Sequence, residues 1–310
     1  MKRDLKSEIK VFLICSSLLF FPFSFCGNHT NAEDEVIENE KPEEKEPEET
    51  ISLNISSYNL RLLTTSDTGD KAWNNRKIYA EKIIRKYDFD IFGTQELVHS
   101  QITDLLALNN NYKYVGVGRN QGTTTGEYCA IFYKKDRFEI LDEGTFWLSL
   151  TPEIPSKGWD AALNRITTWA KIKEKDSGII FYFFNTHFDH QGVIARKESS
   201  KLLLEKMKII AGDIPVICTG DFNLKPDSEP IKYLSNSNYV WDSRFSSETP
   251  IFGTEGTSHG YNLNQSTFNR IDYIFISKTV KVASYGVIND DIELNAFSSD
   301  HFPVFIKAKL

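Results

Sequence analysis

Five short motifs in this 310-residue chain place carboxylate, amide or imidazole groups beside hydrophobic runs that have the character of strands. Four of the motifs end such a run, and the fifth lies just before the last one. Strand ends and the loops that follow them are where proteins concentrate binding and catalytic side chains. In chain order the motifs are Ser57-Tyr58-Asn59, Gly93-Thr94-Gln95-Glu96, Asn185-Thr186-His187, Gly220-Asp221-Phe222-Asn223 and Ser299-Asp300-His301.

If the motifs converge in space, their side chains suit a hard divalent cation. Carboxylate and amide oxygens are ligands that Mg²⁺ and Mn²⁺ prefer more strongly than zinc does. Here such oxygens are offered by Asn59, Glu96, Asp221 and Asp300. A cation of this kind neutralises charge on a phosphoryl group and lowers the pKa of a bound water. His187 and His301 add imidazoles, which donate to a phosphoryl oxygen when protonated and activate water when neutral.

Each motif taken alone also has an ordinary structural explanation. A lone Glu at a strand end is usually a solvated carboxylate, Asp-Phe-Asn is usually a turn, and Asp-His before a strand is often a capping pair. The set is more specific than its parts, because all five motifs stand beside strand-like runs of one chain. We therefore treat them as one candidate site.

The elements that must position these motifs are many short strands and a few helices. Strand-like patterns occupy residues 51–58, 91–94, 128–133, 167–172, 179–185, 215–219, 271–276 and 302–307. Helical spacing is found at residues 75–87, 100–108 and 195–210. This mixture predicts two packed sheets with helices outside them, an α/β sandwich.

In order and context, the motifs resemble those of the endonuclease/exonuclease/phosphatase family. That family includes deoxyribonuclease I, apurinic/apyrimidinic endonucleases, neutral sphingomyelinases, inositol polyphosphate 5-phosphatases and deadenylases. The resemblance covers residues 51–310 and adds Asp272, in Arg270-Ile271-Asp272-Tyr273, to the matching positions. It implies a four-layered α/β sandwich, in which two mostly antiparallel sheets pack together and are flanked by helices. The core segments are most similar to the deadenylase and nocturnin branch.

The resemblance also implies roles for the matching residues. The metal ligands would be Glu96, as the principal one, with Asn59, Asp221 and Asp300. Asp221 would orient or deprotonate the attacking water, and Asn223 would hold water and phosphate. His301, aligned by Asp272, is the competing candidate for the general base or else stabilises the transition state. His187 would contact the phosphoryl oxygens.

Two further residues are candidates for binding the substrate. Arg165 could hold a phosphate in its fork of donors, and an ordinary surface arginine is the equally weighted alternative. Tyr128, in Gly126-Glu127-Tyr128-Cys129, stands where some family members have a phosphate-contacting tyrosine. A core tyrosine is the favoured alternative for this position.

The net charge of −7 is concentrated at the N-terminus. Residues 1–50 hold six Lys or Arg and twelve Asp or Glu, which leaves a net charge of −1 for residues 51–310. Proteins that grip long duplex DNA usually carry a basic stripe, because each neutralised phosphate releases counterions. The nearly neutral body therefore argues against a general DNA-coating nuclease.

Residues 1–26 have the layout of a signal peptide. Basic residues precede an apolar run at 11–25, which at about 15 residues is shorter than the roughly 20 that a membrane-spanning helix needs. A short uncleaved anchor is the alternative. Cys26 resembles the lipid-modified cysteine of bacterial lipoproteins, although Phe25 stands where these proteins carry a small residue. We expect an exported protein in the periplasm or at the cell surface, with a lipid anchor at Cys26 as an open alternative.

Residues 27–50 are rich in glutamate and cannot bury enough apolar surface to fold, so we predict a disordered tether. The folded body at 51–310 is expected to be a monomeric enzyme that hydrolyses phosphate esters with Mg²⁺ or Mn²⁺. We expect an enzyme of the phosphodiesterase or nuclease/exonuclease type, and the alternative is a phospholipase C-like enzyme or a sugar-phosphate phosphatase. The substrate is accordingly a nucleic acid, a phospholipid or a sugar phosphate. A non-enzymatic binding protein on the same scaffold is disfavoured, because every expected catalytic position is retained.

Overall fold

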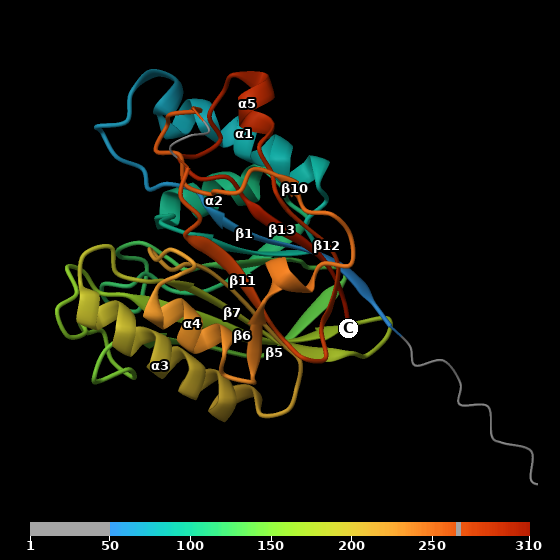
Figure 1. The fold of residues 1–310 in the computed structure, drawn as a ribbon. Coiled ribbons are helices and arrows are strands. Elements are labelled where there is room, and N and C mark those ends of the chain that lie inside the picture. Colours follow the sequence, from blue (N-terminus) through green and yellow to red (C-terminus); the bar gives the residue numbers. More distant parts are fainter. Residues whose placement is uncertain (1–49, 265–267) are drawn as a thin grey trace, which may run out of the picture. The chain divides into compact units, whose positions relative to one another are not determined.

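The computed structural model of the chain describes residues 50–264 and 268–310 (Figure 1). They lie in one compact unit that spans Glu48–Leu310. The expected signal peptide at 1–26, and all but the last residue of the acidic segment at 27–50, lie outside the described residues. No helix in the described part is long and apolar enough to cross a membrane.

The first sheet has seven strands in the order β10-β12-β13-β1-β2-β4-β3. Most neighbouring pairs are antiparallel, whereas β1 pairs with β2, and β10 with β12, in parallel. The strands are β1 (Ser52–Asn59), β2 (Ile91–Gln95), β3 (Tyr112–Val115), β4 (Ile131–Lys134), β10 (Phe252–Gly253), β12 (Lys281–Val287) and β13 (Val304–Lys309).

The second sheet has six strands in the order β5-β6-β7-β8-β11-β9. Its parallel pair is β7 with β8, and the other neighbours are antiparallel. The strands are β5 (Phe138–Trp147), β6 (Ile166–Glu174), β7 (Ile180–His187), β8 (Val216–Asp221), β9 (Val240–Asp242) and β11 (Asp272–Ser277).

Helices cover the outer face of each sheet (Figure 1). Helices α1 (Trp73–Lys86) and α2 (His99–Leu108) pack on the first sheet through one apolar cluster, to which Ile83 and Phe92 belong. Helices α3 (Val193–Ala211) and α4 (Glu229–Ser235) pack on the second sheet through another, to which Leu203 belongs. Short helical segments are α5 (Asp290–Leu294), η1 (Gly69–Lys71) and η2 (Ser243–Ser246).

A third apolar cluster fills the space between the two sheets and includes Ile55 and Ile91 of the first sheet with Phe183 and Ile217 of the second. Burying apolar surface on both faces of each sheet requires cover on both sides, and the result is helices, sheet, sheet and helices. The expected four-layered sandwich with two mostly antiparallel sheets is confirmed.

The two-residue period of the strands explains how the site residues reach one place. Successive side chains on a strand point to opposite faces, so residues two apart share a face. In β8, the side chain of Ile217 lies in the core between the sheets, and Asp221, four residues on, has the same parity. The same relation holds between Ile55 and Asn59 in β1 and between Phe183 and His187 in β7. The strands therefore end with polar groups on the face between the sheets.

A buried polar layer separates this apolar core from the site. Asn185 is fully buried; its Oδ1 accepts from Gln95 at 2.7 Å and from Thr219 at 3.0 Å, and its Nδ2 donates to the carbonyl of Thr94 at 2.8 Å. The layer crosses from one sheet to the other at Gly93. A Cβ at that position would lie within 2.1 Å of Thr219 Oγ1, so no other residue fits there without displacing the layer.

Candidate active site

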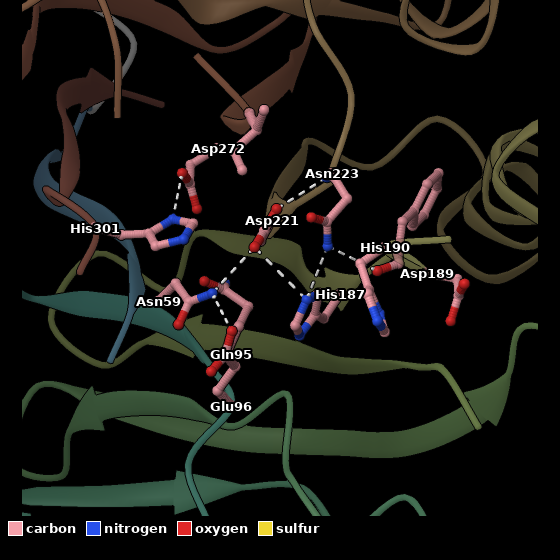
Figure 2. Close-up of polar contacts among 12 residues, drawn as sticks. Asn59, Gln95, Glu96, His187, Asp189, His190, Asp221, Asn223, Asp272 and His301 are labelled. Carbon is pink, nitrogen blue, oxygen red and sulfur yellow. Dashed lines mark hydrogen bonds and ion pairs between the residues drawn. The ribbon is translucent and has the colours of Figure 1, made fainter. Parts of the chain in front are cut away.

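Strand pairing brings four of the five motifs to one edge of the sandwich (Figure 2). Asn59 lies opposite Gln95 in the β1–β2 pair, so Glu96 follows directly beside it. In the second sheet, Asp221 lies opposite both His187 and Asp272. The fifth motif joins through His301, whose ring faces Asp272. The expected convergence of the motifs is therefore what the structure shows.

Asn59 links the acidic groups of the two sheets. Its Nδ2 donates to Glu96 Oε1 at 2.9 Å and to Asp221 Oδ2 at 3.0 Å, while its Oδ1 accepts from the backbone N–H of Arg61 at 3.0 Å. The other oxygen of Glu96 accepts from the N–H of Leu62 at 3.1 Å. Asn59 thus bridges the two carboxylates through its amide nitrogen.

Backbone strain supports a functional role for Glu96 and Asn223. Both have positive φ angles, 69° for Glu96 and 51° for Asn223, in the left-handed region that non-glycine residues seldom adopt. Such conformations cluster at active sites, where surrounding contacts hold them. Here the N–H of Asn223 donates to Asp221 Oδ1 at 2.9 Å.

Asp300 lies at the same pocket and faces a cation. Its Oδ2 is 3.7 Å from Nη1 of Arg61, and its neighbour Ser299 donates through Oγ to the carbonyl of Asn59 at 2.6 Å. Burial is the main reason that the pKa of Asp300 is raised. The hydrogen bond from Ser299 to Asn59 fixes this segment to the end of β1.

Arg76 of α1 contacts the same two segments, namely the chain after β1 and the loop that carries Asp300. Its side chain is fully buried, and it donates to the carbonyl oxygens of Lys71, Leu60, Arg61 and Ser298. The fork of guanidinium donors can satisfy several acceptors at once. Arg76 therefore holds the chain after β1 against the loop that carries Asp300.

His301 forms a buried pair with Asp272. The distance from Nδ1 of His301 to Oδ2 of Asp272 is 2.9 Å, and the same oxygen accepts from Thr257 Oγ1 at 2.5 Å. Burial by itself lowers the pKa of His301, but the charge of Asp272 and its hydrogen bond outweigh burial and raise that pKa well above its usual value. The expected alignment of His301 by Asp272 is present, and it favours the imidazolium form.

His187 lies on the opposite side of Asp221. Its Nε2 is 3.5 Å from Asp221 Oδ2 and 3.1 Å from the amide nitrogen of Asn223. Burial, followed by the nearby charges of Arg165 and Arg119, lowers the pKa of His187 well below its usual value. The lowered pKa favours the neutral imidazole of His187, whose Nε2 lies within hydrogen-bond distance of the Asn223 amide nitrogen.

Asp221 is where these contacts meet. Burial and, next, the charge of Asp272 across the β8–β11 pair raise the pKa of Asp221 to about 7. Buried carboxylates crowded in this way are stabilised by a bound cation. Ligand atoms of Glu96, His187 and Asp221 lie within 4.8 Å of one another, as do those of Asp221, Asp272 and His301. The donor set therefore fits a divalent metal ion.

Arg165 is buried rather than exposed and points its fork toward the site. Its Nε donates to Asp189 at 3.3 Å and its Nη2 lies 2.9 Å from Nδ1 of His190, while its Nη1 is buried without a partner in the described residues. Asp189 in turn accepts from the N–H groups of Gln191 and Gly192, which fixes its position. Arg165 is thus held in place, with one buried donor group unpaired in the described residues.

An open pocket of about 370 Å³ connects these groups. Its walls include the predicted residues Glu96, Arg165, His187, Asp221, Asn223, Asp300 and His301, and also Arg61, Glu127, Leu163 and His190. Sequence reasoning assigned no role to Arg61, Glu127 or Leu163. For Glu127 a signal existed, since it stands beside Tyr128 in a motif that was singled out.

Tyr128 is not brought to this pocket. Its side chain packs in the apolar cluster under α1 and α2, its hydroxyl donates to the carbonyl of Thr123 at 3.1 Å, and its ring stacks on His99. The structure thus agrees with a core tyrosine. The neighbouring carboxylate of Glu127 faces the pocket instead.

The following three proteins are similar to this chain in sequence, and the first of them also in fold. A solved mannosyl-6-phosphatase of Bacteroides thetaiotaomicron is 41% identical, with a TM-score of 0.79, and the match covers 83% of this chain and 99% of that one. Protein angel of Drosophila melanogaster is 27% identical over 76% of this chain and 70% of its own length. Nocturnin of the same fly is 27% identical over 51% of this chain, but over only 25% of nocturnin.

The family profile described as "Endonuclease/Exonuclease/phosphatase family" matches residues 51–301. This range contains all five motifs and Asp272. The angel and nocturnin matches confirm the expected similarity to that branch. The chain therefore belongs to the endonuclease/exonuclease/phosphatase family, whose members hydrolyse phosphate esters.

Proposed function

We propose that this protein is a metal-dependent phosphatase that hydrolyses sugar-phosphate esters. The reaction class is supported mainly by the position of Asp221, which lies between the His301–Asp272 pair and His187. The mannosyl-6-phosphatase, matched over 99% of its length, supports the sugar phosphate as substrate. The neutral body and the small pocket also fit a small ester better than a long nucleic acid.

The site residues have different roles in the hydrolysis. A Mg²⁺ or Mn²⁺ ion bound at Glu96 and Asp221 would neutralise phosphoryl charge and make water more acidic. Asp221 orients the water and accepts its proton. His301, kept as an imidazolium by Asp272, donates to a phosphoryl oxygen in the transition state.

Two further groups hold the phosphate on the other side of Asp221. Arg165 and Asn223 both line the pocket, and Nη1 of Arg165 is a buried donor without a partner in the described residues. Charge-assisted bonds from a preorganised arginine are among the stronger hydrogen bonds in proteins. His187, being neutral, adds no second full positive charge beside the phosphate.

The test compares substrates and variants of the purified full-length chain. Mannose 6-phosphate, bis-p-nitrophenyl phosphate, a phospholipid and single-stranded RNA are assayed with Mg²⁺, with Mn²⁺ and with a chelator. We expect metal-dependent hydrolysis with the highest kcat/KM for mannose 6-phosphate, and a loss of about a thousandfold or more in Asp221→Ala and His301→Ala. Asp213→Ala, at an exposed carboxylate next to α3, is the matched control and should keep full activity.

Three outcomes would contradict the proposal. A folded protein that hydrolyses no ester would remove the enzymatic function. Preference for RNA or for the phospholipid would replace the sugar phosphate by that substrate class. Full activity of the Asp221→Ala or His301→Ala variant would remove that residue from the mechanism.

We also infer that the protein is exported. The signal-like residues 1–26 and the acidic segment 27–50 support this proposal, and Cys26 supports a lipid anchor. Fractionation of cells that produce the chain, together with the mass of the mature N-terminus, tests both points. A cytoplasmic protein with an intact N-terminus would contradict export, and a water-soluble mature form without lipid would contradict the anchor.

A further inference from the structure

One carboxylate in the pocket has no place in the chemistry at phosphorus. Glu127 lies in the loop before β4 and lines the pocket together with Arg165 and His187. A negative group beside a phosphate repels it, so Glu127 cannot serve as a phosphate ligand. Its role must therefore concern another part of the substrate or the fold.

The structure holds this carboxylate in a fixed position. Arg119 donates to it through both terminal nitrogens, Nη1 to Oε2 at 2.8 Å and Nη2 to Oε1 at 2.7 Å, and its backbone N–H donates to the carbonyl of Glu127 at 3.0 Å. Trp147 Nε1 in turn donates to the carbonyl of Arg119 at 2.7 Å. A bidentate pair anchored in this way leaves the carboxylate little freedom to rotate.

Stability alone does not explain the pair. Arg119 is buried and Glu127 is mostly buried, so both charges lose most of their hydration. The attraction within a buried ion pair often does no more than offset that loss, and an apolar pair of similar volume frequently serves the fold as well. A rigid, charged acceptor at the pocket wall is consistent with recognition of a ligand.

The remaining acceptor capacity of Glu127 determines what it can bind. Each carboxylate oxygen has two lone-pair sites, and Arg119 uses one site on each. The free sites suit hydroxyl donors. A second phosphate or a carboxylate on the substrate is disfavoured there, because its unpaired negative charge would lie beside that of Glu127 in a partly buried pocket.

The position of Glu127 next to Arg165 relates this acceptor to the reaction. If Arg165 binds the phosphate, the alcohol portion of the ester lies in the same pocket, whose lining also includes Glu127, Leu163 and His190. A sugar ring has an apolar face and several hydroxyls, which match one aliphatic side chain and two polar ones.

We propose that the Glu127 carboxylate, clamped by Arg119, is a hydroxyl-binding subsite that selects phosphate esters of neutral polyhydroxylated alcohols. The proposal rests on the proposed function, because it names the group that the same pocket recognises beside the phosphate. Glu127 determines specificity and takes no part in proton transfer.

The experiment measures a ratio, so that a general loss of activity does not count as support. The kcat/KM values for mannose 6-phosphate and for p-nitrophenyl phosphate, which has no hydroxyl on its leaving group, are determined with Mg²⁺ for the wild type and Glu127→Gln. Glutamine keeps the shape and removes the charge. We expect the ratio of the two values to fall about tenfold or more, as for a lost hydrogen bond to a charged acceptor.

A matched control and a second variant keep the result interpretable. Glu139→Gln, at an exposed glutamate of β5, should leave the ratio unchanged. Glu127→Asp keeps the charge but retracts it by one methylene, and it should lower the ratio as well; it replaces Glu127→Gln should that variant not fold. A further readout is a sugar phosphate with a second phosphate group, whose relative kcat/KM should rise in Glu127→Gln.

The outcomes separate this inference from the proposed function. If wild-type protein hydrolyses neither ester, the proposed function fails. If it hydrolyses both but the variants lower the two kcat/KM values equally, or leave both unchanged, the hydroxyl subsite is refuted while the phosphatase function stands.

Discussion

The surroundings of His187 and His301 differ, although both rings are buried and both face Asp221. His301 is bonded to the Asp272 carboxylate, whereas His187 has the cations Arg165 and Arg119 nearby. The pKa of His301 is consequently raised and that of His187 is lowered. Burial acts in the same direction on both rings, so the sign of the neighbouring charge decides the outcome.

This difference gives one pocket two imidazoles with separate tasks. A charged ring can stabilise an anionic transition state, while a neutral ring can orient a polar group without repelling a bound cation. Pairs of titratable groups whose environments push their pKa values apart are typical of acid–base sites. The neighbours of each histidine are therefore as much part of the site as the histidines.

Replacing Asp272 with asparagine should have the largest effect on this comparison. The asparagine side chain would keep the geometry of the contact but remove the charge that holds the imidazolium form of His301. We expect kcat/KM to fall by about a thousandfold to ten-thousandfold, the upper value being the loss when the aspartate of a Ser-His-Asp triad is replaced by asparagine. Steady-state kinetics at neutral pH with saturating Mg²⁺ measure this.

The control for Asp272→Asn is another buried ion pair. Asp242 of β9 accepts two contacts from Nη2 of Arg270, at 2.6 and 2.5 Å, and neither residue is among those that line the pocket. Asp242→Asn should destabilise the fold by about 3–5 kcal/mol, as for other broken buried pairs, while the folded fraction keeps its activity. Near wild-type activity of Asp272→Asn would show that the charge on His301 is not needed.

Replacing Arg165 with lysine changes the surroundings of His187, the second imidazole of the comparison. Lysine keeps the positive charge but loses the fork that contacts Asp189 and His190 while leaving Nη1 free. We expect kcat/KM to fall about 10- to 100-fold, mostly through a weaker hold on the phosphate. Arg165→Met should in addition raise the pKa of His187, which its imidazole resonances in NMR titrations report; an unchanged pKa would mean that burial alone keeps the ring neutral.

His259 extends the comparison of His187 with His301, because no charged group of the described residues bonds to either of its ring nitrogens. His259 is buried among Phe268, Phe297 and Phe302, and neither ring nitrogen has a partner in the described part of the chain. Burial, and then the charge of His301, lowers its pKa from 6.5 to about 3. Between these values the unfolded chain binds more protons than the folded one, so stability falls as pH falls.

Because of His259, we expect the free energy of unfolding to fall by about 2 kcal/mol between about pH 7 and about pH 5. Urea unfolding at the two pH values measures it. His259→Phe, which fits the same aromatic cluster, should reduce the pH dependence by about that amount. An equal pH dependence in the variant would place the sensitivity elsewhere, with His187 as the next candidate.

Tyr128→Phe should have the smallest effect. The change removes the hydrogen bond to the Thr123 carbonyl and a 3.4 Å contact with Nδ1 of His99, and it costs about 1 kcal/mol of stability. The kcat/KM value should stay at the wild-type level, as measured in the same assay. A large loss of activity would restore Tyr128 as a phosphate-contacting residue.

Much of the fold was predictable from local pattern. Strands β1, β2, β6, β7, β8, β11 and β13 and helices α1, α2 and α3 all fall within a few residues of their predicted ranges, since each buries a regular apolar face. Strand β5 was not predicted, because most of its residues are exposed or half-buried and no clear alternation results. The strand predicted from residue 128 begins at Ile131, since the N–H of Tyr128 bonds to Leu97 outside the β3–β4 ladder.

The site was predictable where its residues end strands, and less so in loops. Asp221 and His187 have the parity of the core residues before them, so their direction follows from the strand. Glu127 and Tyr128 lie in a loop without a period, and sequence alone could not say which one faces the pocket. Arg119 meets Glu127 through a turn that no local pattern revealed.

The pairing of β1 with β13 determines when this enzyme can become active. These are the first and the last strands of the described chain, and their register joins Ser57 to Val304. During translation, β1 therefore keeps one edge unpaired until β13 leaves the ribosome, and Asp300 and His301 have no fixed place before then. Contacts of such long sequence separation are slow to form. A nascent chain that stops before residue 304 lacks the strand that pairs with both β1 and β12 and that follows Asp300 and His301 directly.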